Sequence, residues 1–149
     1  MAEKLPESFL ELLTRQYADI IAPDNCGFGC GDGWYSIVAQ CCEVLVEANK
    51  LLPPDQPKML IAQVKEKFGT LRFYVDNATP EVRDKISELT NQTETMCEVC
   101  GKAGKPNQGL SKYSWTKTLC KSCAKKRYER EKADQVEYDQ RKKKQNDID

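Results

Sequence analysis

Two cysteine pairs, Cys97-Glu-Val-Cys100 and Cys120-Lys-Ser-Cys123, decide how the last third of this chain can fold. In each pair two residues separate the cysteines, so that one tight turn can direct both sulfurs at a single ion. A spacing of this kind between and within the pairs is typical of structural zinc sites with four thiolate ligands. We therefore expect one structural Zn²⁺ on all four cysteines, with no open coordination position for catalysis.

The residues around the pairs refine this prediction. Gly101 permits a sharp turn after the first pair. The composition of residues 124–128 predicts that Cys120 and Cys123 lie at the first turn of a helix, where the helix dipole favours thiolates. With a hairpin containing Trp115 between the pairs, the order resembles a treble-clef zinc finger. A disulfide or free thiols are the alternative interpretation.

The first 95 residues have the periodicity of a small α+β body. Apolar residues at helical spacing predict helices over residues 7–21 and about 34–51, the second with Asp32 as its N-cap. Thr79-Pro80 opens a third helix. The inward residues expected in the first two helices are Phe9, Leu10, Leu13, Tyr17, Ile20 and Ile21, then Trp34, Ile37, Val38, Cys41, Leu45 and Ala48.

Residues 59–75 predict an antiparallel hairpin that turns at Phe68-Gly69. Alternation places Leu60, Ala62 and Val64 on one face of the first strand, and Leu71, Phe73 and Val75 on one face of the second. The expected fold class is therefore α+β, with helices packed on a small antiparallel sheet. The expected units are an acidic body over 1–95, a four-cysteine zinc module over 96–127, and a charged helical or frayed tail over 128–149.

Charge is divided along the chain although its total is zero. Residues 1–96 have a net charge of −6 and residues 97–149 a net charge of +6, and the sequence has no histidine. The lack of histidine excludes the histidine-dependent nucleases that share treble-clef scaffolds. No run of residues has the length and apolarity of a membrane span or signal segment, so we expect a cytoplasmic protein that does not enter membranes.

The remaining cysteines and the glycine loop at 27–33 leave two questions open. Cys26, Cys30, Cys41 and Cys42 form a second metal site or pack as small hydrophobic residues, and the poor Cys26-Cys30 spacing favours packing. The loop has the glycines of a phosphate-binding loop, but no lysine follows and Asp32 would repel a phosphate. We interpret the glycines as allowing a sharp entry into the next helix.

Four sequence blocks together resemble a family of small zinc-finger proteins encoded by tailed bacteriophages and prophages. The blocks are Gly31-Asp-Gly-Trp-Tyr35, the stretch from Gln63 to Val75 (QVKEKFGTLRFYV), Cys97-Glu-Val-Cys-Gly101 and Trp115-Thr-Lys-Thr-Leu-Cys120. The resemblance spans about residues 28–124. It implies a phage protein in the host cytoplasm and carries over no catalytic residue.

The function we expect is binding without chemistry. A phage accessory protein of this size would block or redirect a host protein or nucleoprotein, and an acidic body suits a basic partner. The expected contact is the loop with two aromatic residues beside carboxylates; Glu43 and Glu47 continue the acidic surface along the second helix. The predicted partner-binding residues are Asp24, Phe28, Asp32 and Tyr35.

Two alternatives stay open. A nucleic-acid-binding module would use basic residues after the second cysteine pair, with Tyr113, Trp115 and Tyr128 for stacking, although acidic residues dilute this segment. An enzyme of unfamiliar type would use Asp32, Glu66 or Cys30. The candidate nucleic-acid contacts are Lys121, Lys125, Lys126, Arg127, Arg130 and Lys132.

Overall fold

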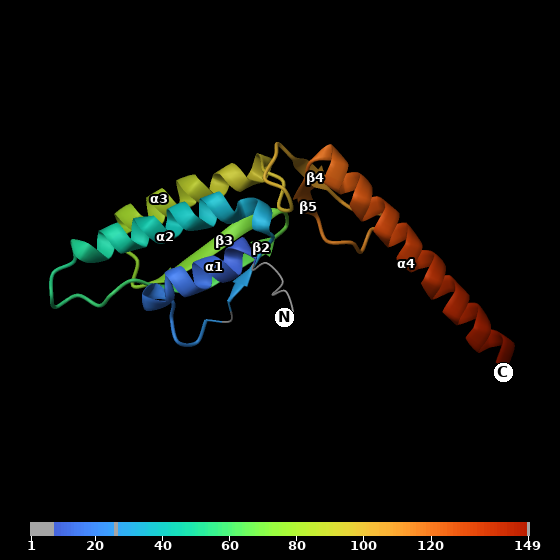
Figure 1. The fold of residues 1–149 in the computed structure, drawn as a ribbon, viewed down its shortest axis with the longest axis horizontal. Helices are drawn as coiled ribbons and strands as arrows, with labels where there is room; N and C mark the ends of the chain where they lie inside the picture. The colour runs from blue at the N-terminus through green and yellow to red at the C-terminus, as the bar shows by residue number, and fades with distance from the viewer. Residues whose placement is uncertain (1–7, 26, 149) are drawn as a thin grey trace, which may run out of the picture.

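The computed structural model describes residues 8–25 and 27–148 and has the expected α+β class. Figure 1 shows the arrangement of its elements. In chain order these are α1 (Phe9–Gln16), η1 (Ala18–Ile20), β1 (Phe28–Gly29), η2 (Asp32–Trp34), α2 (Tyr35–Lys50), β2 (Leu60–Lys67), β3 (Thr70–Asp76), α3 (Pro80–Asn91), η3 (Gln92–Thr95), β4 (Lys105–Asn107), β5 (Lys117–Leu119) and α4 (Lys121–Ile148).

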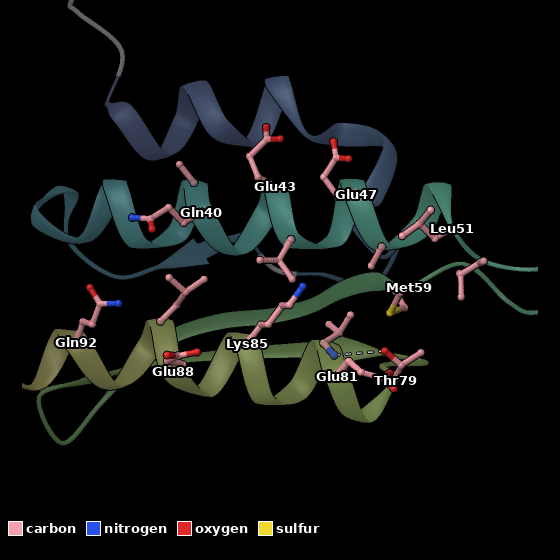
Figure 2. A pocket seen from close by; sticks show the side chains of 16 residues that line it. Gln40, Glu43, Glu47, Leu51, Met59, Thr79, Glu81, Lys85, Glu88 and Gln92 are labelled. Atoms are coloured by element: carbon pink, nitrogen blue, oxygen red, sulfur yellow. Dashed lines mark hydrogen bonds between the residues drawn. The ribbon is translucent and has the colours of Figure 1, made fainter.

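The body is a layer of helices on a three-stranded sheet. The strand order is β1-β2-β3, with β1 parallel and β3 antiparallel to β2. Helices α1, α2 and α3 lie side by side over one face of this sheet (Figure 2). The core lies between the two layers. Most of the stripe predicted for α2 is fully buried there: Trp34, Ile37, Val38, Cys41 and Leu45.

The inward face of β2 differs from the prediction. Ile61 and Val64 are buried, whereas Leu60 and Ala62 are only half-buried. The pairing with β3 shifts between Ile61 and Gln63, so Ala62 is an extra residue on β2. Such a β-bulge interrupts the two-residue alternation and exchanges the faces on either side of it. The prediction for Leu60 and Ala62 was wrong for this reason.

Helix starts follow the sequence in two cases out of three. Ser8 forms a capping box with Glu11 at α1, and the Thr79 side chain accepts a hydrogen bond from the Val82 amide at α3. Asp32 does not cap α2, because it lies inside η2 and makes no capping hydrogen bond. The first helix is also shorter than expected, since a short 3-10 helix replaces its last turn.

The C-terminal part consists of the β4–β5 hairpin and one continuous helix, α4, of 28 residues. Figure 1 shows α4 extending away from the rest of the chain. Among the described residues, no helix is both long enough and apolar enough to cross a membrane.

We predict that Thr93→Val lowers the free energy of unfolding by about 1–3 kcal/mol, because it leaves a buried amide without an acceptor. The Thr93 side chain is fully buried, and its Oγ1 accepts a 3.0 Å hydrogen bond from the Leu71 amide of β3. Chemical denaturation measures the change. Thr95→Val, an exposed position on the same η3 segment, is the matched control and should change stability by less than about 0.5 kcal/mol. Equal effects of the two variants would contradict this account.

Candidate metal centre and helix groove

The four predicted cysteine ligands come together in space. Their sulfur atoms all lie within 4.8 Å of one another, and the Sγ atoms of Cys100 and Cys120 are 3.5 Å apart. Four sulfurs around a tetrahedral ion with bonds of about 2.3 Å would be about 3.8 Å apart, so the cluster has the size that such an ion requires. The prediction that these cysteines can hold a metal ion is confirmed.

Local structure explains how each pair is placed. In the first pair the Gly101 amide donates to the Cys97 carbonyl at 2.9 Å, and Gly101 adopts a φ of 80° that favours glycine. Cys120 immediately precedes α4 and Cys123 lies in its first turn, as expected. The Cys123 amide donates to Cys120 Sγ at 3.4 Å and lowers the pKa of the Cys120 thiol to about 6. This favours the thiolate, which is the form that binds metal.

The glycine loop lies directly against the backbone of the first cysteine pair. The Gly33 amide donates to the Glu98 carbonyl at 2.7 Å. A Cβ atom on Gly33 would lie 2.3 Å from the Cys97 carbonyl oxygen, and one on Gly31 would lie 2.5 Å from that of Glu98. These glycines are therefore needed for close backbone approach rather than for entry into α2. The sequence gives no signal of this, because the partners are more than 60 residues apart in the chain.

Further hydrogen bonds join the body to the metal centre. Trp34 Nε1 donates to the Met96 carbonyl at 2.8 Å. The Thr118 hydroxyl donates to the Gly69 carbonyl at 2.7 Å, which fixes the tip of the β2–β3 hairpin to β5. Within the metal centre the Glu98 amide donates to the Thr118 carbonyl at 3.0 Å, so Thr118 links the cysteine turn to the hairpin tip. The body and the metal centre therefore share a continuous hydrogen-bonded contact.

The other cysteines behave as packing residues where they are described. Cys41 and Cys42 are fully buried, and burial raises the pKa of both thiols, to about 12 for Cys42. Within residues 8–25 and 27–148, the four-cysteine cluster is the one group of three or more histidine, cysteine or acidic side chains close enough together to hold a metal ion. Cys26 lies outside the described residues.

Cys30, one of the residues considered for catalysis, is packed against the core. Burial, together with the nearby charges of Glu98, Asp32 and Glu66, raises the pKa of Cys30 to about 12. A nucleophilic thiol requires the opposite shift. Glu66 is also engaged, since its Oε1 accepts a 2.9 Å hydrogen bond from the Gly69 amide.

The predicted partner-binding loop is less accessible than expected. Phe28 pairs with Val64 in the sheet, and both Phe28 and Tyr35 are half-buried against the core. Asp24 and Asp32 are exposed. Phe28 is less exposed than the two carboxylates because it lies in the β1 edge strand, and Tyr35 because it begins α2; the role of these four residues in partner binding stays a prediction.

One of the basic residues proposed for nucleic acid has a structural position. Arg127 is only 5 % exposed, and its guanidinium donates to the Asn107 carbonyl at 2.8 Å, to Glu131 at 2.9 Å and to the Trp115 carbonyl. It therefore holds the loop between β4 and β5 against α4. The other residues of this set are all exposed on α4: Lys121, Lys125, Lys126, Arg130 and Lys132.

A groove of about 980 Å³ lies between α2 and α3 (Figure 2). Carboxylates border it along both helices, with Glu43 and Glu47 on the side of α2 towards α1 and Glu81 and Glu88 on α3. Lys85 is the basic residue of the lining. The apolar part of the lining consists of Ala39, Val44, Ala48, Leu51, Leu52, Met59, Val82 and Leu89. Only the acidic character of α2 was anticipated from the sequence.

Fold and cysteine cluster together define a small α+β protein with four cysteines placed so that they can hold a metal ion. Compared with family models, curated proteins and solved structures, the chain matches none. The resemblance to phage zinc-finger proteins therefore stays a prediction from the sequence blocks alone.

We predict that Gly33→Ala lowers the free energy of unfolding by about 1–3 kcal/mol or more, the usual range for overpacking. The added Cβ would meet two backbone carbonyl oxygens, those of Cys97 and Glu98, and backbone cannot move aside as a flexible side chain can. Thermal and chemical denaturation measure the loss. Asp32→Ala, an exposed neighbour in the same loop, is the control; a Gly33→Ala variant as stable as this control would show that the loop can move off the cysteine turn at little cost.

We also predict one metal ion per chain, lost in Cys100→Ser. Because the cysteine turn holds the glycine loop, loss of the ion should raise hydrogen exchange at residues 31–35 as well as at 96–127. Elemental analysis and exchange measured by mass spectrometry test both statements. Cys41→Ser, which changes a buried cysteine of the core, should keep the ion. Unchanged protection at residues 31–35 in metal-free Cys100→Ser protein would mean that the body folds independently.

Proposed function

We propose that this chain is a zinc-stabilised binding protein without chemistry of its own, and that it docks a basic helical segment of another protein between α2 and α3. The single observation that carries the proposal is the groove between these helices, apolar inside and bordered by carboxylates of both. A surface of this kind recognises the apolar face of an amphipathic helix and repels acidic partners.

Zinc is the metal that suits the site best. A closed set of four thiolates is soft and tetrahedral, which favours zinc over the oxygen-binding cations and leaves no position for a substrate. The order of cysteine turn, β4–β5 hairpin and α4 is that of a treble clef, and we include this assignment in the proposal.

The dimensions and exposed groups of the groove favour a helical ligand. Helices of 16 and 12 residues, α2 and α3, are about 24 and 18 Å long, which matches a bound helix of three to four turns. Leu51 at the C-terminal end of α2 is 86 % exposed. An exposed leucine beside an apolar groove is a suitable anchor for a partner side chain.

The resemblance to phage zinc-finger proteins suggests a biological setting. In that setting the chain would act in the host cytoplasm and block or redirect a host protein or nucleoprotein. Host proteins that bind nucleic acid carry basic helices for that purpose, and an acidic groove competes with nucleic acid for such a helix. Phe28 and Tyr35, which the sequence suggested as partner contacts, are less suited to be the main contact than the groove, because both are half-buried.

A designed peptide tests the groove without knowledge of the natural partner. The probe is an amphipathic helix of about 14 residues with leucine on one face and lysine on the other, about the length of α2 or α3. We expect it to bind the full chain, with NMR shift changes confined to α2, α3 and the residues around Leu51. A leucine-glutamate peptide of the same pattern should not bind. Equal binding of both peptides, or shifts confined to α4, would contradict the proposal.

Matched variants distinguish binding at the groove from a general effect of the negative charge of the protein. The double variant Glu47→Gln, Glu88→Gln should weaken binding of the lysine peptide about three- to tenfold at low salt, as expected for the loss of two exposed charges. The control is the double variant Glu129→Gln, Glu137→Gln. It removes the same amount of charge at exposed positions of α4, which are distant in sequence from the groove residues. Glu47 and Glu137 each pair with a basic residue of their own helix, so the two variants disturb comparable ion pairs. An equal loss in the control would place the binding surface elsewhere.

A further inference from the structure

The face of the β2–β3 hairpin that points away from the helices is basic and aromatic. Lys65 pairs across the strands with Arg72, and Tyr74, which is 47 % exposed, lies opposite Gln63. These positions alternate with the buried Leu71 and Phe73 of β3, so their side chains lie on the face opposite the core. The body as a whole is acidic, but its hairpin carries a local excess of cations on this face.

The tip of the hairpin adds a pair of stacked rings. Phe68 and Trp115 are 60 % and 49 % exposed, with ring centroids 5.0 Å apart and planes within 8° of parallel. Phe68 has a φ of 53°, which is unfavourable for a bulky residue and easily adopted by glycine or asparagine. The Thr118–Gly69 hydrogen bond holds the turn beside the Trp115 loop. The structure therefore keeps an aromatic ring at this tip although a small residue would suit the turn better.

Cations lie close to the exposed rings. Lys65 Nζ is 5.8 Å from the ring centroid of Tyr74, and Lys67 Nζ is 5.8 Å from that of Phe68. Asp76, at the end of β3, is the acidic residue among the outward positions of these strands. A face that offers flat rings beside cations matches a ligand with exposed flat bases and a negatively charged backbone.

We propose that this face binds a single-stranded nucleic acid. Bases stack on Tyr74 and on the Phe68–Trp115 pair, while the cations contact phosphates. Tyr74 lies five residues after Gly69 of the turn, about 17 Å along the strand, so a segment of several nucleotides reaches both platforms. A duplex is disfavoured because its bases are already stacked inside the helix. The residues that define this basic sheet face are Lys65, Lys67, Phe68, Arg72, Tyr74 and Trp115.

This inference is independent of the α2–α3 groove. The groove opens between the helices that cover one side of the sheet (Figure 2). The alternation along β3 places the basic sheet face on the other side. It also differs from the nucleic-acid contacts expected on α4, because the stacking rings and their nearest lysines belong largely to the hairpin.

The test uses the full chain with its metal and fluorescent oligomers of about 12 thymidylates or 12 uridylates, within the site sizes known for such surfaces. We expect both single strands to bind at about 50 mM salt and a duplex of the same length to bind at least about tenfold more weakly. Three phosphate contacts predict a decrease of about 2 log units in affinity per log unit of salt. A difference between the two oligomers would identify DNA or RNA as the preferred strand. An absence of binding at low salt, equal binding of duplex, or equal competition by polyglutamate would overturn the proposal.

Variants locate the site. Phe68→Asn places a residue that tolerates the turn and removes the ring, so it should weaken binding about tenfold without lowering the thermal midpoint. The double variant Lys65→Gln, Arg72→Gln should reduce the slope of log affinity against log salt concentration by about 1.4, the value for two single-strand phosphate contacts. Lys125→Gln with Lys126→Gln removes the same charge from α4 and should leave binding unchanged.

Full affinity in a folded Phe68→Asn protein, or a loss confined to the α4 variant, would overturn the assignment. The Glu47→Gln, Glu88→Gln groove variant should bind oligomers normally, so failure at one surface is distinguishable from failure at the other.

Discussion

The structure depends on one close approach, that of the glycine loop to the backbone of Cys97 and Glu98. The Gly33 amide bonds to the Glu98 carbonyl, and no side chain larger than hydrogen fits at Gly31 or Gly33. The next residue, Trp34, is fully buried in the body and also donates to the Met96 carbonyl. The same short segment therefore begins α2, fills the core and holds the cysteine turn. A metal ion held at that turn would stabilise the body through these backbone contacts as well as order its own ligands.

Features set by local chemistry could be predicted from the sequence. The cysteine spacing, the Thr79-Pro80 helix start and the Phe68-Gly69 turn depend on residues next to one another, and the structure has all three. Features that depend on distant contacts could not. The bulge at Ala62 follows from how β2 is paired with β3, and the cap expected from Asp32 is replaced by a 3-10 turn whose glycine contacts Glu98.

The same limit explains which site residues were predicted. Cys97, Cys100, Cys120 and Cys123 could be assigned because metal ligation restricts their spacing. Arg127 belongs to a run of basic residues in the sequence, yet it is buried and bonded to carbonyl groups of the loop before β5. Composition gives the charge of a segment, but tertiary contacts decide which of its charges remain available to a ligand.

The division of charge in the body is spatial as well as sequential. Its carboxylates border the groove on α2 and α3, while Lys65, Lys67 and Arg72 lie on the hairpin. A helix layer packed on a sheet separates these groups by about 10 Å, and at about 0.1 M salt the Debye length is of the same order. Exposed charges on the two sides are thus partly screened from one another. A net charge of −6 for residues 1–96 is therefore a poor guide to binding, because a basic helix and a nucleic-acid strand would each meet a surface of opposite sign. Both ligands could bind at the same time, which would suit a protein that acts on a host nucleoprotein.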